Sequence, residues 1–592
     1  LTQELTLSAE TIIQGGGKVT ITGDVDGDDI PDTNGLTDVD ATLADDATKL
    51  GDNVRLFNAS ADLTLDGLTL TGGRTARDFD GGGAIRSTAN IAISDSVLSG
   101  NSTAGQYSNG GAIYGQADVR ILDSTFSGNS TNSAGSGGGA VYGVRIVQLI
   151  GSTLTGNSAR ASDLSAEQPV RGGALIGIGE TILVDSTVRD NTATGGYALG
   201  AGVFAENSLW IVSSTVSANT TSGTFQSQGA GLFSTDELFL IQSTVSGNHA
   251  VGDTALGAGI YSAGGASLIN STVSGNVSTG TSAQVGGIWS DGLSGQGISL
   301  INSIVLGNTS TNNPDVQLYQ NTSSGAATSY QGLNIVGTGS DSDASDGVIN
   351  GVATDIFAAT EEVSDANDSP TGVYAGVLAD NGGSVETVAL RASLSNPALD
   401  AGDDDAALGF TLDEATLGVD INSDGDTNDT FDSVDDFSTD GRGFTRPVDI
   451  PGVANNAANT VDLGAFETQT TPTAGPDILS STSGDDSIAA LDGNDLVLGS
   501  AGNDTLDGGE GTDDTLSYQT LIATVPSVPT FGARFAGRPG RGAGHPRRGR
   551  RHCLGLREPD RHPGRRQPDR RRERQHPDGS RLGRRALRGG RQ

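Results

Sequence analysis

The chain of 592 residues contains no methionine, a single cysteine and only 4% aromatic residues. One cysteine cannot form a disulfide within the chain, so cross-links of this kind do not hold the fold together. No stretch approaches the roughly 18 consecutive apolar residues of a membrane-spanning helix, which excludes a membrane-spanning bundle. Hydrophobic residues make up 34%, too few for a series of compact enzyme domains with large aliphatic cores.

Basic side chains are scarce in most of the chain. Residues 1–530 hold 14 Lys and Arg against 67 Asp and Glu, whereas residues 531–592 hold 20 Arg against five acidic residues. The acidic excess argues against nucleic acid as a partner of the body. Patterns for zinc, a phosphate-binding loop or a nucleophile elbow are missing. A signal-peptide pattern is missing too, and because the chain starts at Leu1 we expect it to begin inside a longer chain.

Glycine, by contrast, is abundant, with 89 residues, and much of it belongs to an internal repeat. A hexapeptide similar to STVSGN recurs eight times, most often 28 residues apart, and ends at Asn101, Asn129, Asn157, Asn191, Asn219, Asn248, Asn276 and Asn308. A second motif, similar to GGAI, keeps step with it and ends at Ile85, Ile113, Val141, Leu175, Val203, Leu232, Ile260 and Ile288.

Aliphatic and polar residues alternate between the two motifs. One aliphatic column consists of Ile93, Ile121, Leu149, Leu183, Ile211, Leu240, Leu268 and Leu300. Alternation with a period of two places such residues on one face of a strand. One unit of short strands cannot bury its own aliphatic face, whereas stacked units can. The sequence therefore predicts an all-β fold, a right-handed single-stranded parallel β-helix of about 28 residues per coil.

The hexapeptide also aligns polar residues into columns. The Asn column predicts a side-chain ladder at a turn, because Asn tolerates left-handed backbone and its amide can bond the next coil. The column of Ser residues from Ser96 to Ser303 predicts a tight inward position. Phe126–Asn129 and the GGAI motif resemble the FxxN and GGAI repeats of polymorphic outer-membrane and autotransporter-type β-helix proteins, over about residues 55–310. This resemblance bears on the fold more than on the function.

Two acidic loops have the spacing of calcium-binding sites. The first is similar to the loops of thrombospondin type 3 and dockerin repeats and contains Asp24, Asp26, Asp28 and Asp32. The second has EF-hand-like oxygen ligands at positions 1, 3, 5 and 7, which are Asp420, Asn422, Asp424 and Asp426. Its position 12 is Phe431 instead of the usual bidentate glutamate. We expect Ca²⁺ at both loops, weakly at the second, with a solvated acidic turn as the alternative.

A third acidic motif repeats every nine residues after residue 480. Its recurring glycine and aspartate positions are Gly484, Asp486, Gly493, Asp495, Gly502, Asp504, Gly511 and Asp513. Apolar residues follow two positions after the aspartates, at Ile488, Val497 and Leu506, with Leu516 displaced by one extra Asp. The motif resembles the GGxGxDxUx nonapeptide of RTX proteins, which implies a β-roll with Ca²⁺ between its turns. Carboxylates this close would repel without the cation, so we expect folding to be coupled to calcium.

Three further segments resemble the "choice-of-anchor Q" region of bacterial surface proteins: Asn396–Gly402, Asp440–Pro447 and Val461–Glu467. The resemblance implies that this region closes the β-helix before a variable sorting module. An open end of a β-helix is an unpaired sheet edge and has to be covered. We expect Arg442 and Arg446 to pair with nearby aspartates and carbonyl groups in this cap rather than to act in catalysis.

The arginine-rich tail that includes Cys553 has no strand periodicity and no interleaved aromatic residues. Codons that encode Leu556–Arg571 can be chosen so that reading them one nucleotide later gives an RTX-like sequence. We therefore interpret the tail as a disordered product of a shifted reading frame, after which the native chain would continue in calcium repeats. A genuine basic arm that binds nucleic acid or anionic surfaces is the alternative.

Polysaccharide lyases, hydrolases and epimerases also use parallel β-helices, and some epimerases carry RTX modules. Asp95, Asp123 and Asp185 share one column of the repeat, but later coils place Ser, Gln or Asn there. We interpret this column as the solvated end of a strand, and His249 as a surface residue. An extracellular polysaccharide lyase or epimerase remains the alternative to a protein without catalytic activity.

The sequence thus predicts five parts: an N-terminal cap (1–54), the β-helix (55–350), its C-terminal anchor-like part (351–467), the RTX repeats (468–520) and the tail (521–592). We expect a calcium-binding bacterial protein with an adhesive or structural role, secreted by type I export or displayed on the cell surface. The expected partners are Ca²⁺ and a host surface, a biofilm surface or a polysaccharide, not nucleic acid.

Overall fold

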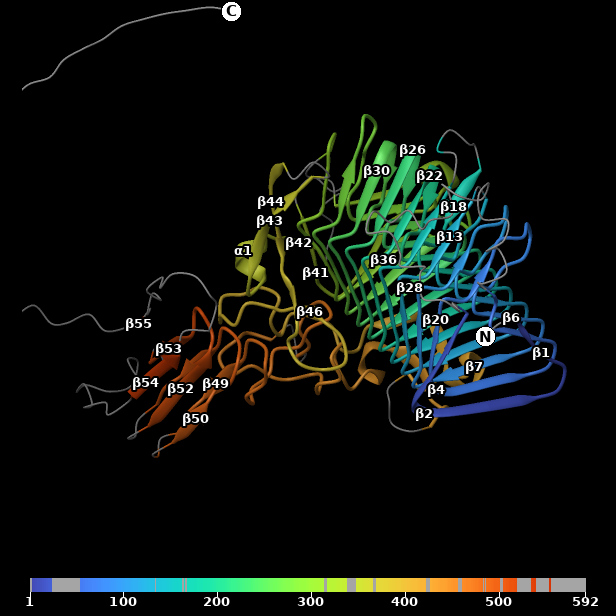
Figure 1. Cartoon of the computed structure of the whole chain (residues 1–592). Helices are drawn as coiled ribbons and strands as arrows, with labels where there is room; N and C mark the ends of the chain where they lie inside the picture. The colour runs from blue at the N-terminus through green and yellow to red at the C-terminus, as the bar shows by residue number, and fades with distance from the viewer. Residues whose placement is uncertain are drawn as a thin grey trace, which may run out of the picture. The chain divides into compact units, whose positions relative to one another are not determined.

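The computed structural model describes residues 3–23, 54–518, 534–538 and 553–554. Within 54–518 the exceptions are residues 134, 162–163, 165–167, 314–316, 338–347, 366–368, 422–425, 456–459, 483, 485 and 501–503. The described part is all-β, with 55 strands and four helices of three or four residues each (Figure 1). No helix in this part of the chain is long and apolar enough to cross a membrane.

Residues 3–23 and 54–350 form a parallel β-solenoid of about ten turns with roughly 28 residues each, which confirms the predicted fold class. Three parallel sheets, A, B and C, make its sides, and each coil adds one strand to sheet A, commonly two to sheet B and one to sheet C. Sheet A contains β1 (Leu5–Leu7), β3 (Phe57–Ala59), β6 (Ile85–Ser87), β10 (Ile113–Gly115), β14 (Val141–Gly143), β19 (Leu175–Gly177), β23 (Val203–Ala205), β27 (Leu232–Ser234), β31 (Ile260–Ser262), β35 (Ile288–Ser290) and β39 (Leu318–Gln320).

Sheet B is the widest side of the solenoid. It contains β2 (Thr11–Thr22), β4 (Leu63–Thr71), β7 (Ile91–Ser94), β8 (Val97–Ser99), β11 (Val119–Leu122), β12 (Thr125–Ser127), β15 (Val147–Ile150), β16 (Thr153–Thr155), β20 (Thr181–Val184), β21 (Thr187–Arg189), β24 (Leu209–Val212), β25 (Thr215–Ser217), β28 (Glu237–Ile241), β29 (Thr244–Ser246), β32 (Gly265–Ile269), β33 (Thr272–Ser274), β36 (Ile298–Ile301), β37 (Ile304–Val305), β40 (Ser329–Gln331), β41 (Asn334–Val336) and β42 (Val348–Asn350). Sheet C contains β5 (Arg74–Thr75), β9 (Ser102–Thr103), β13 (Ser130–Asn132), β17 (Ser158–Arg160), β18 (Pro169–Arg171), β22 (Thr192–Leu199), β26 (Thr220–Gln228), β30 (His249–Leu256), β34 (Val277–Thr279) and β38 (Thr309–Ser310).

The predicted aliphatic column fills the interior of the solenoid. Ile93, Ile121 and Leu149 pair in register on β7, β11 and β15, and each is at most 1% exposed. Because the strands stack in parallel with identical faces inward, each coil buries its apolar residues against the coils on either side. One continuous core cluster therefore runs from Leu56 to Val336.

The Asn column forms the predicted ladder inside this core. Nδ2 of Asn219 donates to Oδ1 of Asn248 at 3.0 Å and to the carbonyl oxygen of Val188 at 2.9 Å, and the same bonds recur from coil to coil. The ladder ends at Gln317, whose Oε1 accepts a bond of 3.2 Å from Nδ2 of Asn308. All eight Asn residues are fully buried, so each amide depends on its neighbours for its hydrogen bonds.

The aspartate column that raised the question of catalysis lies at a corner of the coil. One residue per coil has a positive φ there, between 43° and 63°: Gly67, Asp95, Asp123, Gly151, Asp185, Ser213, Gln242, Asn270, Asn302 and Gly332. Gly, Asn and Asp are the residues that adopt this left-handed conformation most readily. Asp95 and Asp123 are exposed, as expected, but Ser213, Gln242, Asn270 and Asn302 of the same column are buried, so the predicted solvated strand end holds only for the earlier coils. The backbone conformation explains why Gly and polar residues occupy this position.

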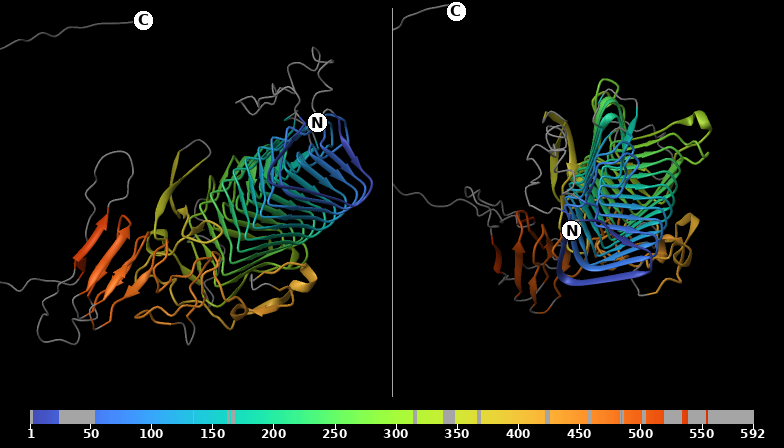
Figure 2. Two further views of the ribbon diagram at one scale, coloured as in Figure 1. Left: turned by 60° about the horizontal axis from the view of Figure 1, so that its bottom comes forward. Right: turned by 45° about the vertical axis from the view of Figure 1, so that its right-hand side comes forward.

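A second apolar column points outward from sheet B. It includes Ile182, Val184, Val212, Ile241, Ile269 and Ile301, all at most 1% exposed. Residues 403–437, here called the covering segment, pack on it through β47 (Ala407–Asp413), α2 (Glu414–Leu417), β48 (Thr430–Ser433) and η2 (Val434–Asp436). Figure 2 shows the covering segment lying alongside the strands of the solenoid. Sheet B is consequently buried on both of its faces over these coils.

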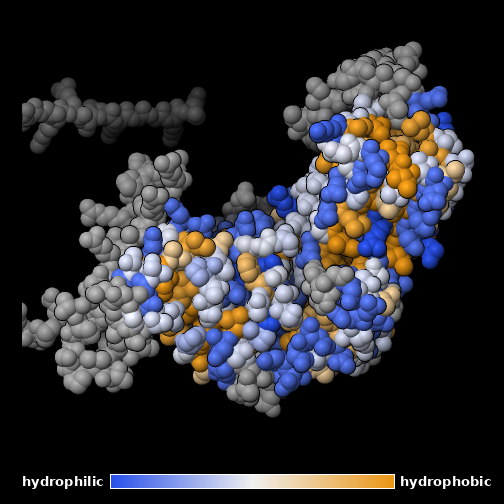
Figure 3. Space-filling view, turned by 90° about the horizontal axis from the view of Figure 1, so that it is seen from below, coloured by the Kyte–Doolittle hydropathy of each residue, from blue (hydrophilic) through white to orange (hydrophobic). Residues whose placement is uncertain are grey.

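The anchor-like part contacts both the last coil and the flank of the solenoid. α1 (Ala353–Ile356) packs with Ile304 and Ile335, which face away from the solenoid interior, since their neighbours Val305 and Val336 lie in the core cluster. The covering segment and the residues after it also bind the side of the solenoid, where Asp403 N donates to Oδ1 of Asn302 at 2.8 Å. These contacts lie on the flank of the solenoid, and the closure of its open end stays a prediction. Apolar and hydrophilic side chains are interleaved over the face seen in Figure 3.

The C-terminal strands form a smaller parallel structure, here called the roll. One sheet contains β49 (Ile478–Ser480), β51 (Leu496–Leu498) and β53 (Thr515–Ser517), and the other contains β50 (Ser487–Ala489) and β52 (Thr505–Glu510). Within the segment expected to be disordered, β54 (Arg534–Arg538) and β55 (Cys553–Leu554) each add one strand to these sheets.

Candidate calcium site

The turns of the roll stack in two rows because neighbouring strands of one sheet are two nonapeptides apart. Ile478 pairs with Leu496, and Ser487 pairs with Thr505, each eighteen residues further on. Leu479, Val497 and Leu506 are at most 2% exposed and form the core between the two sheets. The apolar positions of the nonapeptide thus lie inside the roll, as predicted, and the aspartates lie at its turns.

The aspartates of each row form a ladder of hydrogen bonds. Oδ1 of Asp495 accepts the amide of Asp477 at 2.9 Å, and Oδ1 of Asp504 accepts that of Asp486 at 3.0 Å. In the last turn Oδ1 of Asp514 accepts the amide of Asp495 at 3.3 Å. We refer to the turns that end at these five aspartates, in chain order, as turns 1 to 5.

Two ladder residues differ from the predicted set. Asp514, not Asp513, occupies the ladder position in turn 5, because the extra residue there shifts the pairing to nineteen residues, and Asp513 is exposed. Asp477 was missed, although Gly475 and Asp477 stand nine residues before Gly484 and Asp486. Pro476 between them and the absence of an earlier copy obscured this first repeat.

The glycines of the repeat allow the stacked turns to approach one another closely. A Cβ atom at Gly493 would lie 2.5 Å from the carbonyl oxygen of Gly475, and one at Gly511 would lie 2.0 Å from that of Gly493. Gly484 is exposed in turn 2, and Gly502 lies outside the described residues. Since a side chain would separate the turns, glycine here keeps backbone carbonyl oxygens within reach of the next turn.

Burial makes the aspartates of one row costly to ionise. Asp495 is 1% exposed, and its Oδ2 accepts no hydrogen bond. Its burial, together with the nearby carboxylates of Asp477 and Asp514, raises its pKa to about 8. Burial also raises the pKa of Asp477 to about 7. A bound cation would supply the compensating charge that these groups lack.

The chemistry of the turns fits calcium. Ca²⁺ prefers six to eight oxygen ligands from carboxylates, carbonyls and water. Among the described residues, no three His, Cys, Asp or Glu side chains converge on one point. The ladder instead brings one carboxylate per turn close to the glycine backbone: a Cβ atom at Gly493 would lie 2.5 Å from the carbonyl oxygen of Gly475 and 3.0 Å from Oδ1 of Asp495. Carbonyl groups would therefore complete any coordination sphere here.

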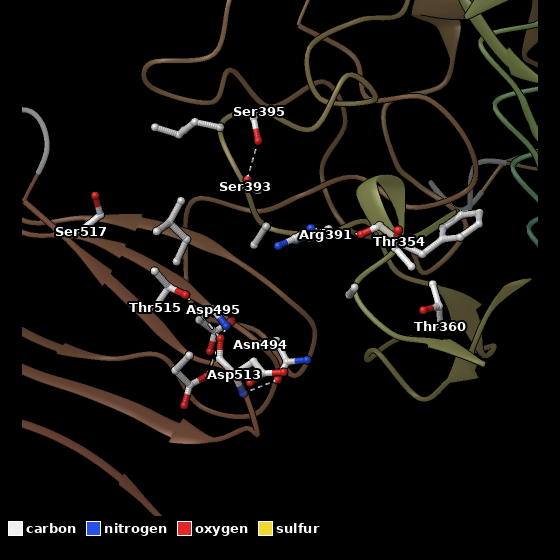
Figure 4. Close-up of a pocket in the computed structure, with 16 residues that line it drawn as sticks. Thr354, Thr360, Arg391, Ser393, Ser395, Asn494, Asp495, Asp513, Thr515 and Ser517 are labelled. Carbon is white, nitrogen blue, oxygen red and sulfur yellow. Dashed lines mark hydrogen bonds between the residues drawn. The ribbon is translucent and has the colours of Figure 1, made fainter. Parts of the chain in front are cut away.

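A cavity of about 720 Å³ borders turns 3 and 5 of the roll (Figure 4). Its acidic wall comes from turns 3 and 5 and includes Asp495 and Asp513. The opposite wall carries Arg391, whose Nη1 donates to the carbonyl oxygen of Thr354 at 3.0 Å, and several hydroxyl groups. The acidic turns thus face solvent-accessible space, which gives an ion a path to them.

The second acidic loop projects from the covering segment. Both carboxylate oxygens of Glu414, which is fully buried, hold the loop closed by accepting the amides of Ile421 at 2.6 Å and Asp429 at 3.3 Å. Asp420 and Asp426 lie at its two sides, and Asn422 and Asp424 lie outside the described residues. Phe431, at the position of the missing glutamate, is 1% exposed and packs against the solenoid. The first loop, with Asp24, Asp26, Asp28 and Asp32, lies wholly outside the described residues.

The two arginines of the anchor-like part are buried in ion pairs, as expected. Nη2 of Arg442 lies 2.7 Å from Oδ2 of Asp440, and its guanidinium stacks 3.7 Å from the ring centre of Phe466. Nε of Arg446 lies 3.1 Å from Oε2 of Glu467, and its Nη1 donates to a carbonyl oxygen at 3.0 Å. Fully buried and paired in this way, both arginines serve the structure.

A second cleft, of about 530 Å³, separates the solenoid from the hairpin of β43 (Thr360–Ser364) and β44 (Pro370–Gly376). It is lined by Arg189 and His249 from the solenoid and by Glu361 and Glu362 from the hairpin. The two walls are more than a hundred positions apart in the sequence, so no local pattern could bring them together.

Comparison with known proteins finds one match. Residues 474–514 match the family model described as the RTX calcium-binding nonapeptide repeat (4 copies). The match begins before Asp477 and ends at Asp514, the two ladder residues that the structure adds. No curated protein and no solved structure matches the chain. The roll therefore consists of RTX calcium-binding repeats, and calcium is its ligand.

Proposed function

We propose that this chain is a secreted or surface-displayed adhesive protein whose C-terminal roll folds when it binds calcium outside the cell. The observation that carries the proposal is the buried, unpaired Oδ2 of Asp495 within a ladder of RTX aspartates. A carboxylate buried without a partner costs free energy until a cation neutralises it. Binding of the ion and ordering of the turns are then one process.

In the roll, the proposed ligands are Gly493, Asp495, Gly502, Asp504 and Gly511 of the predicted set, with Asp514 in the place of the exposed Asp513. Gly484 and Asp486 of the predicted set, and Asp477, which the ladder adds, belong to the first two turns. The acidic loop with Asp420, Asn422, Asp424 and Asp426 and the N-terminal loop with Asp24, Asp26, Asp28 and Asp32 are proposed as further, weaker sites. Their alternate oxygen side chains support this assignment.

Extracellular location follows from the same chemistry. Calcium-coupled folding favours an unfolded roll where calcium is scarce and a folded roll where it is abundant. RTX repeats are typical of secreted proteins, and type I export is the route that this resemblance implies. The acidic body, with 67 Asp and Glu against 14 Lys and Arg over residues 1–530, supports a role away from nucleic acid.

The adhesive role rests on the architecture of the solenoid. Stacked coils present their variable loops in rows along a rigid surface, as repeat proteins do when they bind extended partners. A surface polysaccharide or a host surface is the partner that we propose. Binding of the chain to immobilised bacterial or host polysaccharides, with and without EDTA, measures this role.

Isothermal titration of the full chain with Ca²⁺, and separately with Mg²⁺, tests the calcium part of the proposal. We expect several Ca²⁺ ions per chain and weaker heats with Mg²⁺, since its small octahedral shell suits flexible carbonyl-rich turns poorly. Absence of saturable Ca²⁺ binding would refute the proposed function.

The enzyme alternative is tested at the cleft beside the hairpin of β43 and β44. The measurement is an assay for new unsaturated ends on acidic polysaccharides with the intact chain, with Arg189→Ala and with Glu362→Gln. Activity that disappears in both variants but survives Asp123→Gly would replace the adhesive role with a catalytic one. We expect no such activity.

A further inference from the structure

The first two turns of the roll satisfy their aspartates differently from the later ones. Oδ2 of Asp477 accepts the amide of Thr473 at 2.6 Å, and its Oδ1 accepts the hydroxyl of the same threonine at 2.9 Å. Oδ2 of Asp486 likewise accepts the amide of Thr482 at 2.7 Å, and its Oδ1 accepts the hydroxyl at 3.0 Å. Each threonine stands four residues before its aspartate.

The later turns lack this threonine. Leu491 occupies the corresponding position before Asp495 and Ser500 that before Asp504. Leu491 has no side-chain donor, and Oδ2 of Asp495 has no hydrogen-bond partner. Nitrogen of Ser500 donates to Oγ of Ser481 at 2.7 Å, and the hydroxyl of Ser500 donates to the carbonyl oxygen of Thr482, a residue of the preceding turn in its row. A carboxylate has about four acceptor positions, and in turns 1 and 2 the amide and the hydroxyl of a threonine fill two of them.

The position of these two turns explains the difference. Turns 1 and 2 begin their rows, so their carboxylates have no earlier turn of the row to bind. β49 lies at one edge of its sheet, and Ile478 on it is fully buried in a cluster with Leu463 and Phe466 of the anchor-like part. The first strand of the roll is therefore fixed to the rest of the protein by apolar packing that needs no ion.

We propose that turns 1 and 2 form a calcium-independent start of the roll, in which Thr473 and Thr482 take the place of the ion, and that calcium is bound from turn 3 onward. This inference rests on the proposed function and assigns its sites within the roll. The ordered first turns offer the amides of Asp477 and Asp486 to the carboxylates of the next turns. Calcium then adds turns to a template that already exists, which spares the costly first step of ordering.

Calcium stoichiometry tests the assignment. Titration of the full chain is repeated with Asp477→Asn and Asp495→Asn. We expect Asp477→Asn to bind as many Ca²⁺ ions as the unchanged chain and Asp495→Asn to bind at least one fewer. Loss of an ion in Asp477→Asn would overturn the inference and leave the proposed function standing. A chain that binds no Ca²⁺ would overturn both.

Hydrogen exchange with mass spectrometry tests the role of the threonines in the full chain. In EDTA we expect the amides of Ile478 and Thr482, whose acceptors are Gln469 and Asp486, to be protected, and those of residues 495–517 to exchange freely until Ca²⁺ is added. Thr473→Val with Thr482→Val, which keeps the side-chain shape, should lower the protection of these two amides in EDTA by about tenfold or more. Thr505→Val is the matched control on β52 and should change nothing. Equal dependence of all turns on Ca²⁺ in the unchanged chain would refute the inference.

Discussion

The amide of Asp477 donates a 2.9 Å hydrogen bond to the carboxylate of Asp495, eighteen residues further along the chain. The same bond, repeated at Asp486 with Asp504 and at Asp495 with Asp514, links each turn of the roll to the next turn of its row. Asp495, Asp504 and Asp514 thus each position a neighbouring turn with Oδ1, and Oδ2 of Asp495 has no hydrogen-bond partner. This geometry joins the calcium chemistry of the roll to its folding.

Replacing the last aspartate of the ladder tests whether Asp514, as in the structure, or Asp513, as the nine-residue spacing predicts, takes part in calcium binding. Asp514→Asn should weaken calcium binding by about tenfold or more, because it removes a half-buried charge from the ladder. Asp513→Asn, next to it and exposed, is the matched control and should have a much smaller effect. Isothermal titration measures both, and a larger effect of Asp513→Asn would contradict the assignment of turn 5.

The buried ladder predicts a large cost for the loss of one asparagine. Asn219→Ala removes the acceptor of the amide of Asn191, one of the two acceptors of its Nδ2, and the donor to the carbonyl oxygen of Val188, so the free energy of unfolding should fall by about 2–4 kcal/mol. Asn207→Ala, at an exposed position, should change it by less than about 0.5 kcal/mol. Urea unfolding followed by circular dichroism compares the free energies of unfolding of the two variants. Similar values would contradict a stabilising role for the hydrogen bonds of the ladder.

The left-handed backbone at the corner of the coil predicts which substitutions of an exposed aspartate lower the free energy of unfolding. Asp123 has φ of 44°, where a β-branched residue is strained. Asp123→Val should therefore lower the free energy of unfolding by about 1–3 kcal/mol, whereas Asp123→Gly should leave it unchanged or raise it slightly. Thermal unfolding of the two variants checks this order. A tolerated valine would show that the corner does not select the residue.

Stability should also depend on pH through a carboxyl group outside the calcium sites. Burial and the nearby Asp462 raise the pKa of Asp400 to about 7 in the folded protein, above its ordinary value near 4. The stabilising contribution of the protonated group is complete below about pH 4 and is lost as pH rises through 7. Asp400→Asn keeps an oxygen that can accept the amide of Ile450 and cannot ionise.

The variant and the unchanged chain should accordingly be similarly stable near pH 4, and the variant should be the more stable of the two at pH 8. Denaturant unfolding at both pH values, in EDTA, measures the difference. A difference that does not change with pH would show that folding does not raise the pKa of Asp400.

Much of the solenoid could be predicted because both its core residues and its turn residues recur with the same spacing. The aliphatic column and the Asn ladder follow from strict spacing, so residues such as Ile121 and Asn219 lie where the period places them. The covering segment could not be predicted in this way. The run Leu238–Ile241 is apolar on both faces of its strand, but nothing local tells which distant segment covers the outer face.

The middle of the candidate site could also be predicted from regular spacing, but its first and last aspartates were missed. The nonapeptide period identified Asp486, Asp495 and Asp504, which all join the ladder. It failed at Asp477, where a proline alters the first copy, and at Asp514, where an inserted residue shifts the register. Pairing between strands, not spacing along the chain, decides which aspartate aligns with its neighbour.

Limited proteolysis of the full chain with a glutamyl endopeptidase, in EDTA and in millimolar Ca²⁺, tests the coupling of calcium to folding most directly. This serine protease needs no metal, and Glu510 at the end of β52 is exposed. We expect rapid cleavage after Glu510 in EDTA, protection in Ca²⁺, and a solenoid that resists cleavage in both. Equal cleavage after Glu510 with and without Ca²⁺ would contradict this coupling.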